Sequence, residues 1–385
     1  MSGPLTGVRV VEMAGIGPLP MAAMLLADLG ATVLRIERLV PSGLGIPRPM
    51  RYVLVNRNRK SVAIDLKATE GVGVVLDLVA KSDILIEGFR PGTMERLGLA
   101  PDVCLSRNPR LVYGRMTGWG QEGPLSPTAG HDLNYLALTG ALFAIGRKDQ
   151  PPTPPLNLVA DYGGGAMYLV LGVLAALVEA RSSGQGQIVD AAMIDGVLSL
   201  MTAFYGLKAA GLHHEERGTN MLDSGAPYYE VYRCADGGYM SVAAIEPKFR
   251  AEFIRLLDLD GKGLPDLDDQ ANWQLAKRMI GDRFMSRARA HWEKVFAESD
   301  ACVAPVLSMS EAPNHPHMKA RGGFIDVDGV VQPAPAPRFS RTRPGKPTPP
   351  EVNAFGDGSA LREWSIPEER IAQLREAGVV SPPTC

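Results

Sequence analysis

The opening of the chain, residues 8–38, constrains its fold most. It reads as an apolar run rich in β-branched residues at 8–13, a helical pattern at 20–30 that ends on Gly30, and a second β-rich run at 31–38. Two strands joined by one helix form a parallel pair with a right-handed crossover. Runs at 61–66, 83–89 and 110–120 continue the alternation, so we expect an α/β fold with a doubly wound sheet over about the first 200 residues.

The turn inside this first unit, GIGPLP, partly matches the glycine fingerprint of dinucleotide-binding folds. Gly15 and Gly17 fill the first two glycine positions, and Glu37 lies 20 residues after Gly17, where the fingerprint places an acid. Pro20 stands at the third glycine position. We therefore do not expect a nicotinamide cofactor on the strength of this motif.

The length of 385 residues exceeds what one hydrophobic core usually supports, so two domains are expected. After residue 200 the pattern changes, because two antiparallel strands joined at Asp236–Gly238, with helices at 248–257 and 273–287, indicate a smaller α+β domain. The proline-rich segment 331–350 is expected to be extended. We divide the chain into a large domain at 1–200, a linker at 201–217, the small domain at 218–311, a proline-rich connection at 312–350 and a tail at 351–385.

Composition argues against several kinds of partner. The chain has 40 Lys plus Arg against 42 acidic residues, a formal net charge of -2, so no nucleic-acid partner is expected. The longest apolar run, 166–178, is too short to span a bilayer, so we expect a buried helix and no membrane. The cysteines stand far apart without CxxC spacing, which argues against disulfides and zinc and fits a reducing cytoplasm; they are Cys104, Cys234, Cys302 and Cys385.

Three residues could carry acid–base chemistry. His131 stands just before a helical pattern, where an imidazole would lie beside the free N–H groups of a helix start. Asp161 precedes the glycines 163–165, which allow close approach of a ligand and open the buried helix. Glu246 lies where a strand meets a proline. Each has a structural alternative: a packed histidine, a helix cap and a helix-entry residue, respectively.

Basic residues gather where strands are expected to end, the edge at which α/β sheets bind ligands. They are Arg38, Arg57, Arg59, Lys60, Lys67 and Arg90. Either they form a solvated rim, or they bind a small ligand rich in phosphate. Paired histidines at 213–214 and at 315 and 317 have no acidic or thiol partner at ligand spacing, so we expect no metal site.

Taken together, the motifs of the chain resemble a known family. The match runs from Leu5 to Phe339 and includes LIEGFRPG, MTGWGQEGP, AGHDLNYLALTG, PLNLVADYGGG, NMLDSGAPYY, ADGGYMSVAAIEPKF and DACVAPVL. These resemble the family III coenzyme A transferases and, within them, the α-methylacyl-CoA racemases. The motifs GHDLNY, ADYGGG, MLDSGAPYY and AIEPKF resemble the racemase branch in particular.

The resemblance implies a fold, a partner and a set of site residues. The fold is an interlocked homodimer with a Rossmann-like large domain, completed by the returning tail, and a smaller α+β domain. His131 and Asp161 would be the acid–base residues, and Glu246 would partner His131. The acyl-CoA substrate would be bound by Arg38, Ile64, Asp65, Leu66, Lys67, Arg90, Gly130, Leu133, Asn134 and Tyr135.

A mechanism follows for a racemase of acyl thioesters. Inverting carbon 2 needs a proton removed from one face and one returned to the other, so two groups must flank the carbon. We assign His131 and Asp161 to these faces, and the backbone N–H of Asp132 to the enolate oxygen. No metal or redox cofactor is needed, since coenzyme A is part of the substrate.

Alternatives to this activity remain at the level of sequence. In a family III transferase Asp161 would attack the thioester as a nucleophile, but that reaction has no use for a histidine–glutamate pair. A catalytically silent CoA-binding protein would not need all three candidate residues. The chain also departs from the expected pattern at Leu19 and Ser224, where we expect glycine, and this leaves the acyl-chain preference open.

Overall fold

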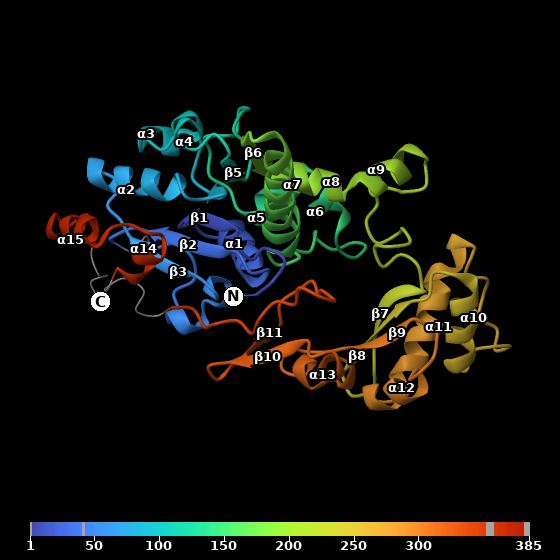
Figure 1. Cartoon of the computed structure of the whole chain (residues 1–385). Helices are drawn as coiled ribbons and strands as arrows, with labels where there is room; N and C mark the ends of the chain where they lie inside the picture. Colours follow the sequence, from blue (N-terminus) through green and yellow to red (C-terminus); the bar gives the residue numbers. More distant parts are fainter. Residues whose placement is uncertain (1, 41–42, 352–357, 381–385) are drawn as a thin grey trace. The chain divides into compact units, whose positions relative to one another are not determined.

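The computed structural model describes residues 2–40, 43–351 and 358–380, and it contains two compact units (Figure 1). The large unit consists of Met1–Thr139, Leu156–Leu200 and Gly322–Cys385, and the small unit of Gly140–Pro155 and Met201–Arg321. Residues 140–155 and 201–217 thus group with the small unit, and 322–350 with the large one. This division differs from the one expected from the sequence. Cys385 lies outside the described residues.

The large unit is built on a six-stranded sheet in the order β3-β2-β1-β4-β5-β6, with every neighbouring pair parallel. The predicted parallel α/β sheet is confirmed. The order in which strands are added reverses between β1 and β4, and parallel sheets bind ligands at the carboxyl ends of the strands at such a point. The strands are β1 (Arg9–Met13), β2 (Thr32–Glu37), β3 (Lys60–Ala63), β4 (Ile84–Glu87), β5 (Val112–Thr117) and β6 (Gln187–Ala192).

Helices and a separate hairpin complete the large unit (Figure 1). The helices are α1 (Pro18–Asp28), α2 (Thr69–Val79), α3 (Thr93–Arg96), α4 (Pro101–Arg107), α5 (Asp132–Leu138), α7 (Met167–Ser183), α8 (Met193–Leu200), α14 (Ser359–Glu363) and α15 (Glu368–Glu376). Short 3₁₀ turns are η1 (Met50–Tyr52) and η2 (Leu54–Asn56), and η3 (Leu158–Ala166) is π-helical. The hairpin β10 (Phe324–Val327) and β11 (Val330–Pro333) lies within the segment that we expected to be a plain connection.

The tail of the chain completes a core of the large unit. Leu361, Trp364 and Leu374, each at most 1% exposed, pack in one cluster with Leu34 of β2 and Val75 of α2. Main-chain contacts join the same parts, because the N–H of residue 65 donates to the carbonyl of residue 379 at 2.9 Å. Burying these apolar side chains ties the described end of the chain to the first strands.

The apolar helix α7 lies on β5 and β6, and it continues directly from η3. Gly114 of β5 makes room for this packing, because a Cβ there would lie 2.8 Å from Val173 and 2.9 Å from Leu169. The combined run Leu158–Ser183 has 26 residues and, by length and composition, could cross a membrane; half of its most apolar stretch is buried inside the protein. The apolar run 166–178 is therefore part of a longer helical segment, and the expectation of no membrane partner stays a prediction.

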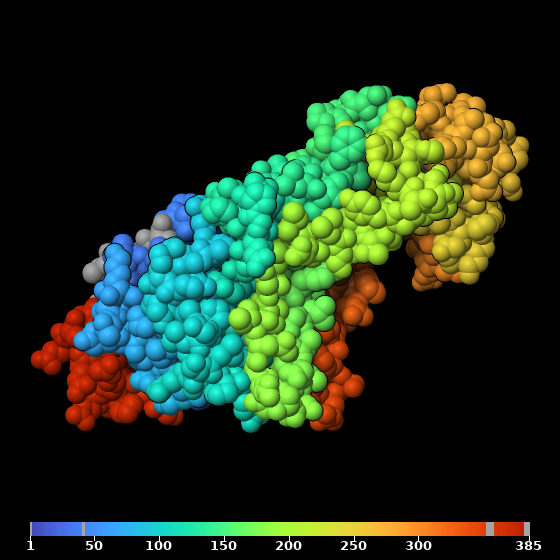
Figure 2. Space-filling model, turned by 90° about the horizontal axis from the view of Figure 1, so that it is seen from above, coloured from blue at the N-terminus to red at the C-terminus, as the bar shows by residue number. Residues whose placement is uncertain are grey.

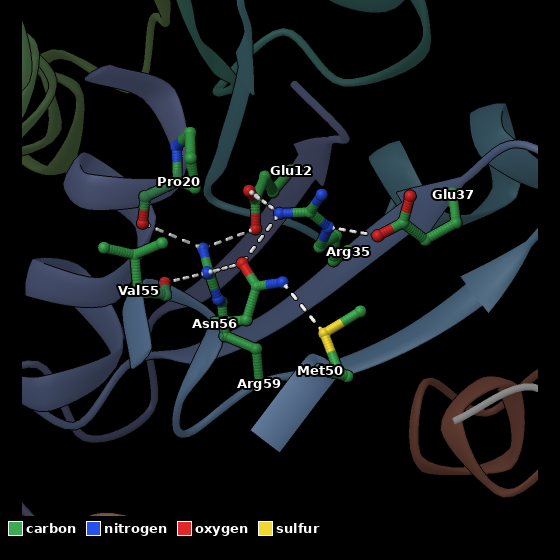
Figure 3. Close-up of polar contacts among 8 residues, drawn as sticks. All are labelled: Glu12, Pro20, Arg35, Glu37, Met50, Val55, Asn56 and Arg59. Atoms are coloured by element: carbon green, nitrogen blue, oxygen red, sulfur yellow. Dashed lines mark hydrogen bonds and ion pairs between the residues drawn. The ribbon is translucent and has the colours of Figure 1, made fainter. Parts of the chain in front are cut away.

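Buried charges stabilise the junction of β1, β2 and the segment before β3 (Figure 3). We call Glu12, Arg35, Glu37, Asn56 and Arg59 the Glu12 cluster. Glu12 is fully buried and pairs with Arg35 at 3.2 Å and with Arg59 at 2.8 Å. Arg35 also pairs with Glu37, and Asn56 accepts from both arginines at 3.0 and 2.8 Å. Register causes this pairing, because Glu12 and Arg35 are direct neighbours across β1 and β2.

The adjacent arginine, Arg57, is equally structural. It pairs with Asp28 at the end of α1 and donates to Gln332 at 3.0 Å, so it joins α1 to β11. Lys60 pairs with Glu363 of α14. Both alternatives from the sequence are therefore wrong for Arg57 and Arg59, which are 3% and 5% exposed and form neither a solvated rim nor a ligand site.

The small unit has a three-stranded sheet in the order β7-β8-β9, antiparallel throughout. The predicted hairpin across Asp236–Gly238 is confirmed as β7 and β8. An aromatic-rich core with Phe253, Phe284 and Trp292 packs its helices onto this sheet. Its elements are α6 (Ala141–Ala144), α9 (Thr202–Ala209), β7 (Tyr229–Arg233), β8 (Tyr239–Ala243), α10 (Pro247–Leu256), η4 (Gln270–Asn272), α11 (Trp273–Met285), α12 (Arg289–Val295), β9 (Val303–Val306), η5 (Ala312–Asn314) and α13 (Pro316–Ala320).

Candidate active site

His131 is held at the start of α5, beyond the carboxyl end of β5. It is the N-cap residue of that helix, with extended backbone angles of φ −132° and ψ 173°. Its N–H donates to the side chain of Asn134 at 3.0 Å, and the N–H of Asn134 returns a bond to its carbonyl at 2.8 Å. The imidazole is exposed. The backbone thus fixes the histidine while its ring stays accessible.

Asp161 lies inside the π-helical segment η3, not on a loop before a helix. Its neighbours Gly164 and Gly165 are buried, and a Cβ on them would lie 2.8 Å from Val197 of α8 and 2.8 Å from Met193. The glycines therefore allow η3 to pack closely on α8, and the expectation that they precede the start of the helix is wrong, because the helical segment already runs through them. Single π-helical turns recur at functional sites.

The environment of Asp161 favours its protonated form. Burial raises the pKa of Asp161 and outweighs the hydrogen bond that its Oδ2 accepts from Asn157 at 3.2 Å. The Asp132 carboxylate raises this pKa further, whereas His131 lowers it. α5 and η3 are in contact here, because the side chain of Asp132, the residue after His131, accepts the N–H of Asp161 at 2.7 Å. Asn157 was missed in the sequence, although its spacing of four residues from Asp161 suits one helix face.

Asp132 has a side-chain role that the sequence did not indicate. Its Oδ2 accepts the N–H groups of Ala160 at 2.9 Å and of Asp161 at 2.7 Å. The residue is 6% exposed, and within the described part of the chain its Oδ1 has no hydrogen-bond partner. The signal available in the sequence was an acid at the first position of a helix, directly after the candidate base.

The turn before α1 shapes the space around Asp161. Gly17 has φ +66°, and a Cβ there would lie 3.1 Å from Oδ2 of Asp161, so a side chain would be both strained and crowded. Leu19 is 1% exposed and lies against Gly15 and Gly88, at 3.1 and 3.3 Å from where their Cβ atoms would stand. Gly88 follows β4, so Leu19 packs between the chain segments that follow β1 and β4.

Tyr135 and Trp119 support the segment that carries His131. The Tyr135 hydroxyl donates to the carbonyl of Gly130, and its ring meets Trp119 edge-on with centroids 4.7 Å apart. Gly118 and Gly130 leave room for the tyrosine ring, since Cβ atoms there would overlap it. Burial raises the pKa of Tyr135 to about 12, with a further rise from Asp161 and an opposing effect of Arg90. The hydroxyl of Tyr135 is therefore used within the protein, where it holds the segment before α5.

The predicted CoA-binding residues lie at strand ends. Arg38 follows β2 and Arg90 follows β4; both are exposed, and Phe89 lies under Arg38 at 6.0 Å. Ile64–Lys67 follow β3, with Ile64 buried and Lys67 exposed. The Asp65 carboxylate accepts the N–H of residue 67 at 2.9 Å, so it shapes this turn. Leu133 and Asn134 are exposed on α5.

Glu246 lies in the small unit, whereas His131 lies in the large one. It is the exposed N-cap residue of α10, where Pro247 begins the helix. Its carboxylate contributes, after burial, to raising the pKa of Cys302. The pairing of Glu246 with His131 stays a prediction. Among residues 2–40, 43–351 and 358–380, no three His, Cys, Asp or Glu side chains form a group that could hold a metal ion.

The fold and the site together define a class: a doubly wound α/β protein with a histidine and an aspartate beyond the carboxyl edge of its sheet. The chain belongs to CoA-transferase family III, whose family model matches residues 5–354. It is 42% identical to the α-methylacyl-CoA racemase of Mus musculus over 98% of this chain and 97% of that protein. It is 32% identical to the succinyl-CoA–L-malate CoA-transferase alpha subunit of Chloroflexus aurantiacus, over 98% and 92%.

Solved structures agree with this family. A CaiB/BaiF family protein from Brucella suis superposes with a TM-score of 0.79 at 25% identity. The match covers 94% of this chain and 99% of that one. The likeness therefore extends over nearly the whole of both chains.

Proposed function

We propose that this protein interconverts the two configurations at carbon 2 of 2-methylacyl-CoA thioesters. The observation that carries the proposal is the contact between α5 and η3, where Asp132, the residue after His131, accepts the N–H of Asp161 at 2.7 Å, in a chain 42% identical to the α-methylacyl-CoA racemase of Mus musculus. A histidine and a carboxylic acid on opposite faces of one carbon are what a two-base proton transfer requires.

Each base removes a proton in one direction and returns one in the other. In one direction His131 takes the α-proton, the electrons move into the thioester to form an enolate, and protonated Asp161 delivers a proton to the opposite face. The raised pKa of Asp161 supports its part as an acid. The backbone N–H of Asp132, at the first position of α5, would stabilise the enolate oxygen as charge develops.

The pH dependence follows from the sign of this shift. When Asp161 acts as the base, it must be ionised, and its raised pKa means that protonation begins at a higher pH than for an ordinary aspartate. Removal of the proton from the Asp161 face is therefore expected to fall on acidification earlier than a normal carboxylate would allow. The pH–rate profile for each epimer separately measures this.

Substrate binding is assigned to the strand ends. Arg38, Lys67 and Arg90 are exposed and lie beyond β2, β3 and β4, so they can meet the phosphates of coenzyme A. Phe89, half-buried between Gly88 and Arg90, lies under the Arg38 guanidinium. Coenzyme A is part of the substrate in this proposal, and the reaction uses no further cofactor.

A homodimer is part of the proposal. Met167, Leu171 and Val178 are 54%, 63% and 71% exposed and recur on one side of α7 at helical spacing. In the space-filling view the chain around α7 and α8, in green, lies at the molecular surface (Figure 2). A second copy would cover this stripe. Light scattering is expected to show a dimer at assay concentration, and a fully active monomer would contradict this part.

CoA transfer is the alternative within the family. There Asp161 would attack the thioester carbonyl, expel the CoA thiolate and form a mixed anhydride. The 32% identity to a CoA-transferase is consistent with CoA transfer. The higher identity to a racemase, 42%, and the presence of His131 favour racemisation. The two reactions differ in products, so one experiment separates them.

The test uses one pure 2-methylacyl-CoA epimer in heavy water, followed for configuration and for deuterium at carbon 2. Racemisation with deuterium incorporation is the expected result. Acyl-group transfer to an added carboxylate, with trapping of Asp161 by hydroxylamine and no inversion, would instead establish the transferase.

A further inference from the structure

We infer that the buried carboxylate of Asp132 is a positioning residue that holds Asp161 in place for proton transfer; this rests on the proposed function. The carboxylate accepts two main-chain N–H groups on the same oxygen, those of Ala160 at 2.9 Å and Asp161 at 2.7 Å. The Asp132 side chain is therefore hydrogen-bonded directly to the backbone of the candidate base, Asp161.

The geometry explains why such a contact is needed. Ala160 and Asp161 are the third and fourth residues of η3, and the first N–H groups of any helix lack partners within it. The side chain of Asp132 supplies the missing acceptor from the first turn of α5. One residue thus offers its main-chain N–H beside His131 and its side chain to Asp161, so the two bases share a single support.

The charge of Asp132 also acts on Asp161. A helix start needs only an acceptor, which asparagine or serine would supply, yet here a carboxylate is buried with its Oδ1 unpartnered among the described residues. Burying an incompletely paired carboxylate costs stability. Its negative charge opposes ionisation of Asp161, whose other titratable neighbours are His131 and Tyr135. The carboxylate therefore fixes both the place of Asp161 and its readiness to hold a proton.

The test compares two substitutions with a matched control. Asp132→Ala removes the acceptor and the charge, while Asp132→Asn keeps an acceptor oxygen and removes the charge. Asp83→Ala is the control, because Asp83 also accepts a main-chain N–H, from Arg9 at 2.8 Å, but lies before β4 at the opposite edge of the sheet. Exchange of the α-proton in heavy water is measured for each epimer of a 2-methylacyl-CoA, together with the pH profile.

An asymmetric loss is expected. Asp132→Ala should lose roughly 100-fold in exchange of the epimer served by Asp161, identified with Asp161→Asn, because misplacing a catalytic group by about 1 Å costs this much. Exchange of the other epimer should stay within a few-fold. Asp132→Asn should recover most of the lost rate, with the acid limb for the Asp161 face moved to lower pH, since a like charge has been removed. Asp83→Ala should slow neither epimer.

Two results would overturn the inference: equal loss for both epimers in Asp132→Ala, or no loss for either. If the wild type exchanges neither epimer, the proposed function is wrong. Amide hydrogen exchange then tests separately whether Asp132 holds the backbone of Ala160 and Asp161. Unchanged protection of the Ala160 and Asp161 amides in Asp132→Ala would show that Asp132 does not hold them.

Discussion

The Glu12 cluster and the pair His131 and Asp161 are both groups of charged or ionisable side chains in the large unit, but they differ in how their charges are satisfied. Both carboxylate oxygens of Glu12 meet an arginine, and Asn56 bridges the two arginines (Figure 3). Among the residues that the structure describes, the carboxylate of Asp161 accepts one hydrogen bond, from Asn157, and the Asp132 carboxylate raises its pKa. Paired charges stabilise a fold, whereas an incompletely satisfied acid remains free to exchange a proton with a substrate.

The largest effect on activity is predicted for substitutions of the two bases, His131 and Asp161. His131→Ala and Asp161→Asn should each abolish racemisation, because one face of carbon 2 loses its acid, and the exchange that remains should be roughly 100- to 10,000-fold slower. Each variant should still exchange the α-proton of one epimer, and the two variants should exchange opposite epimers. Heavy-water exchange on both pure epimers measures this.

The same variants should leave the urea midpoint of unfolding nearly unchanged, since the imidazole is exposed and asparagine can replace the Asp161 side chain. Glu246→Gln should resemble a weakened His131→Ala. Exchange of the same epimer by both variants, or normal racemisation by His131→Ala, would refute the two-base assignment.

The opposite behaviour is predicted for the Glu12 cluster. Arg59→Met should lower the free energy of unfolding by about 3–5 kcal/mol, because it leaves Glu12 buried with one partner fewer. Burial lowers the pKa of Arg59 to about 10, and the Glu12 carboxylate opposes this shift. Urea denaturation followed by circular dichroism gives the change.

Adding Glu12→Gln to Arg59→Met should restore part of the lost stability, as the uncompensated charge is removed. If Arg59→Met left the stability unchanged but removed the activity, Arg59 would serve catalysis and not the stability of the fold. The contrast between the Glu12 cluster and the pair His131 and Asp161 would then be wrong.

Exposed arginines at the strand ends give a smaller effect. Arg90→Ala should raise the KM for acyl-CoA by about 10- to 150-fold with little change in kcat, since a charged hydrogen bond contributes about 1.5–3 kcal/mol. Arg107→Ala is the matched control, because Arg107 is an exposed arginine of the same unit that pairs with Asp77. Steady-state kinetics would contradict the assignment if both variants gave the same KM.

The smallest effect is expected in the small unit, at Ser224. This residue has φ +71°, a left-handed conformation that disfavours side chains. Ser224→Gly should raise the free energy of unfolding by about 0.5 kcal/mol, after the greater freedom of glycine in the unfolded chain is counted. Differential scanning calorimetry measures it, with Ser224→Val as the destabilising counterpart. A loss of racemisation in the glycine variant would show that this strain serves the site.

The sequence predicted the parallel sheet because alternating strand and helix patterns depend only on local residue types. It could not distinguish the buried Arg59 from the exposed Arg90, since both follow apolar runs. Arg59 is buried against Glu12, whose place beside Arg35 is set by the register of β1 and β2. The same limit applies to Leu19. Its neighbours Gly15 and Gly88 come together only when β1 and β4 pair.

For the site, the sequence supplied His131 and Asp161 as candidates but not the reason they meet. Asp161 was expected on a loop, because three successive glycines rarely continue a helix, yet close packing on α8 holds them in η3. The side-chain role of Asp132 depends on a contact across 28 and 29 residues, which no local pattern reveals.

Because η3 continues directly into α7, the direction of Asp161 is sensitive to insertions and deletions. An α-helix turns by about 100° for each residue, so deleting one residue between Asp161 and α7 would rotate Asp161 by about that angle around the helix axis. The rest of α7 could keep its contacts with β5 and β6 while the carboxylate turned away from His131. A single lost codon could therefore convert an inverting enzyme into a folded protein that handles only one face of its substrate.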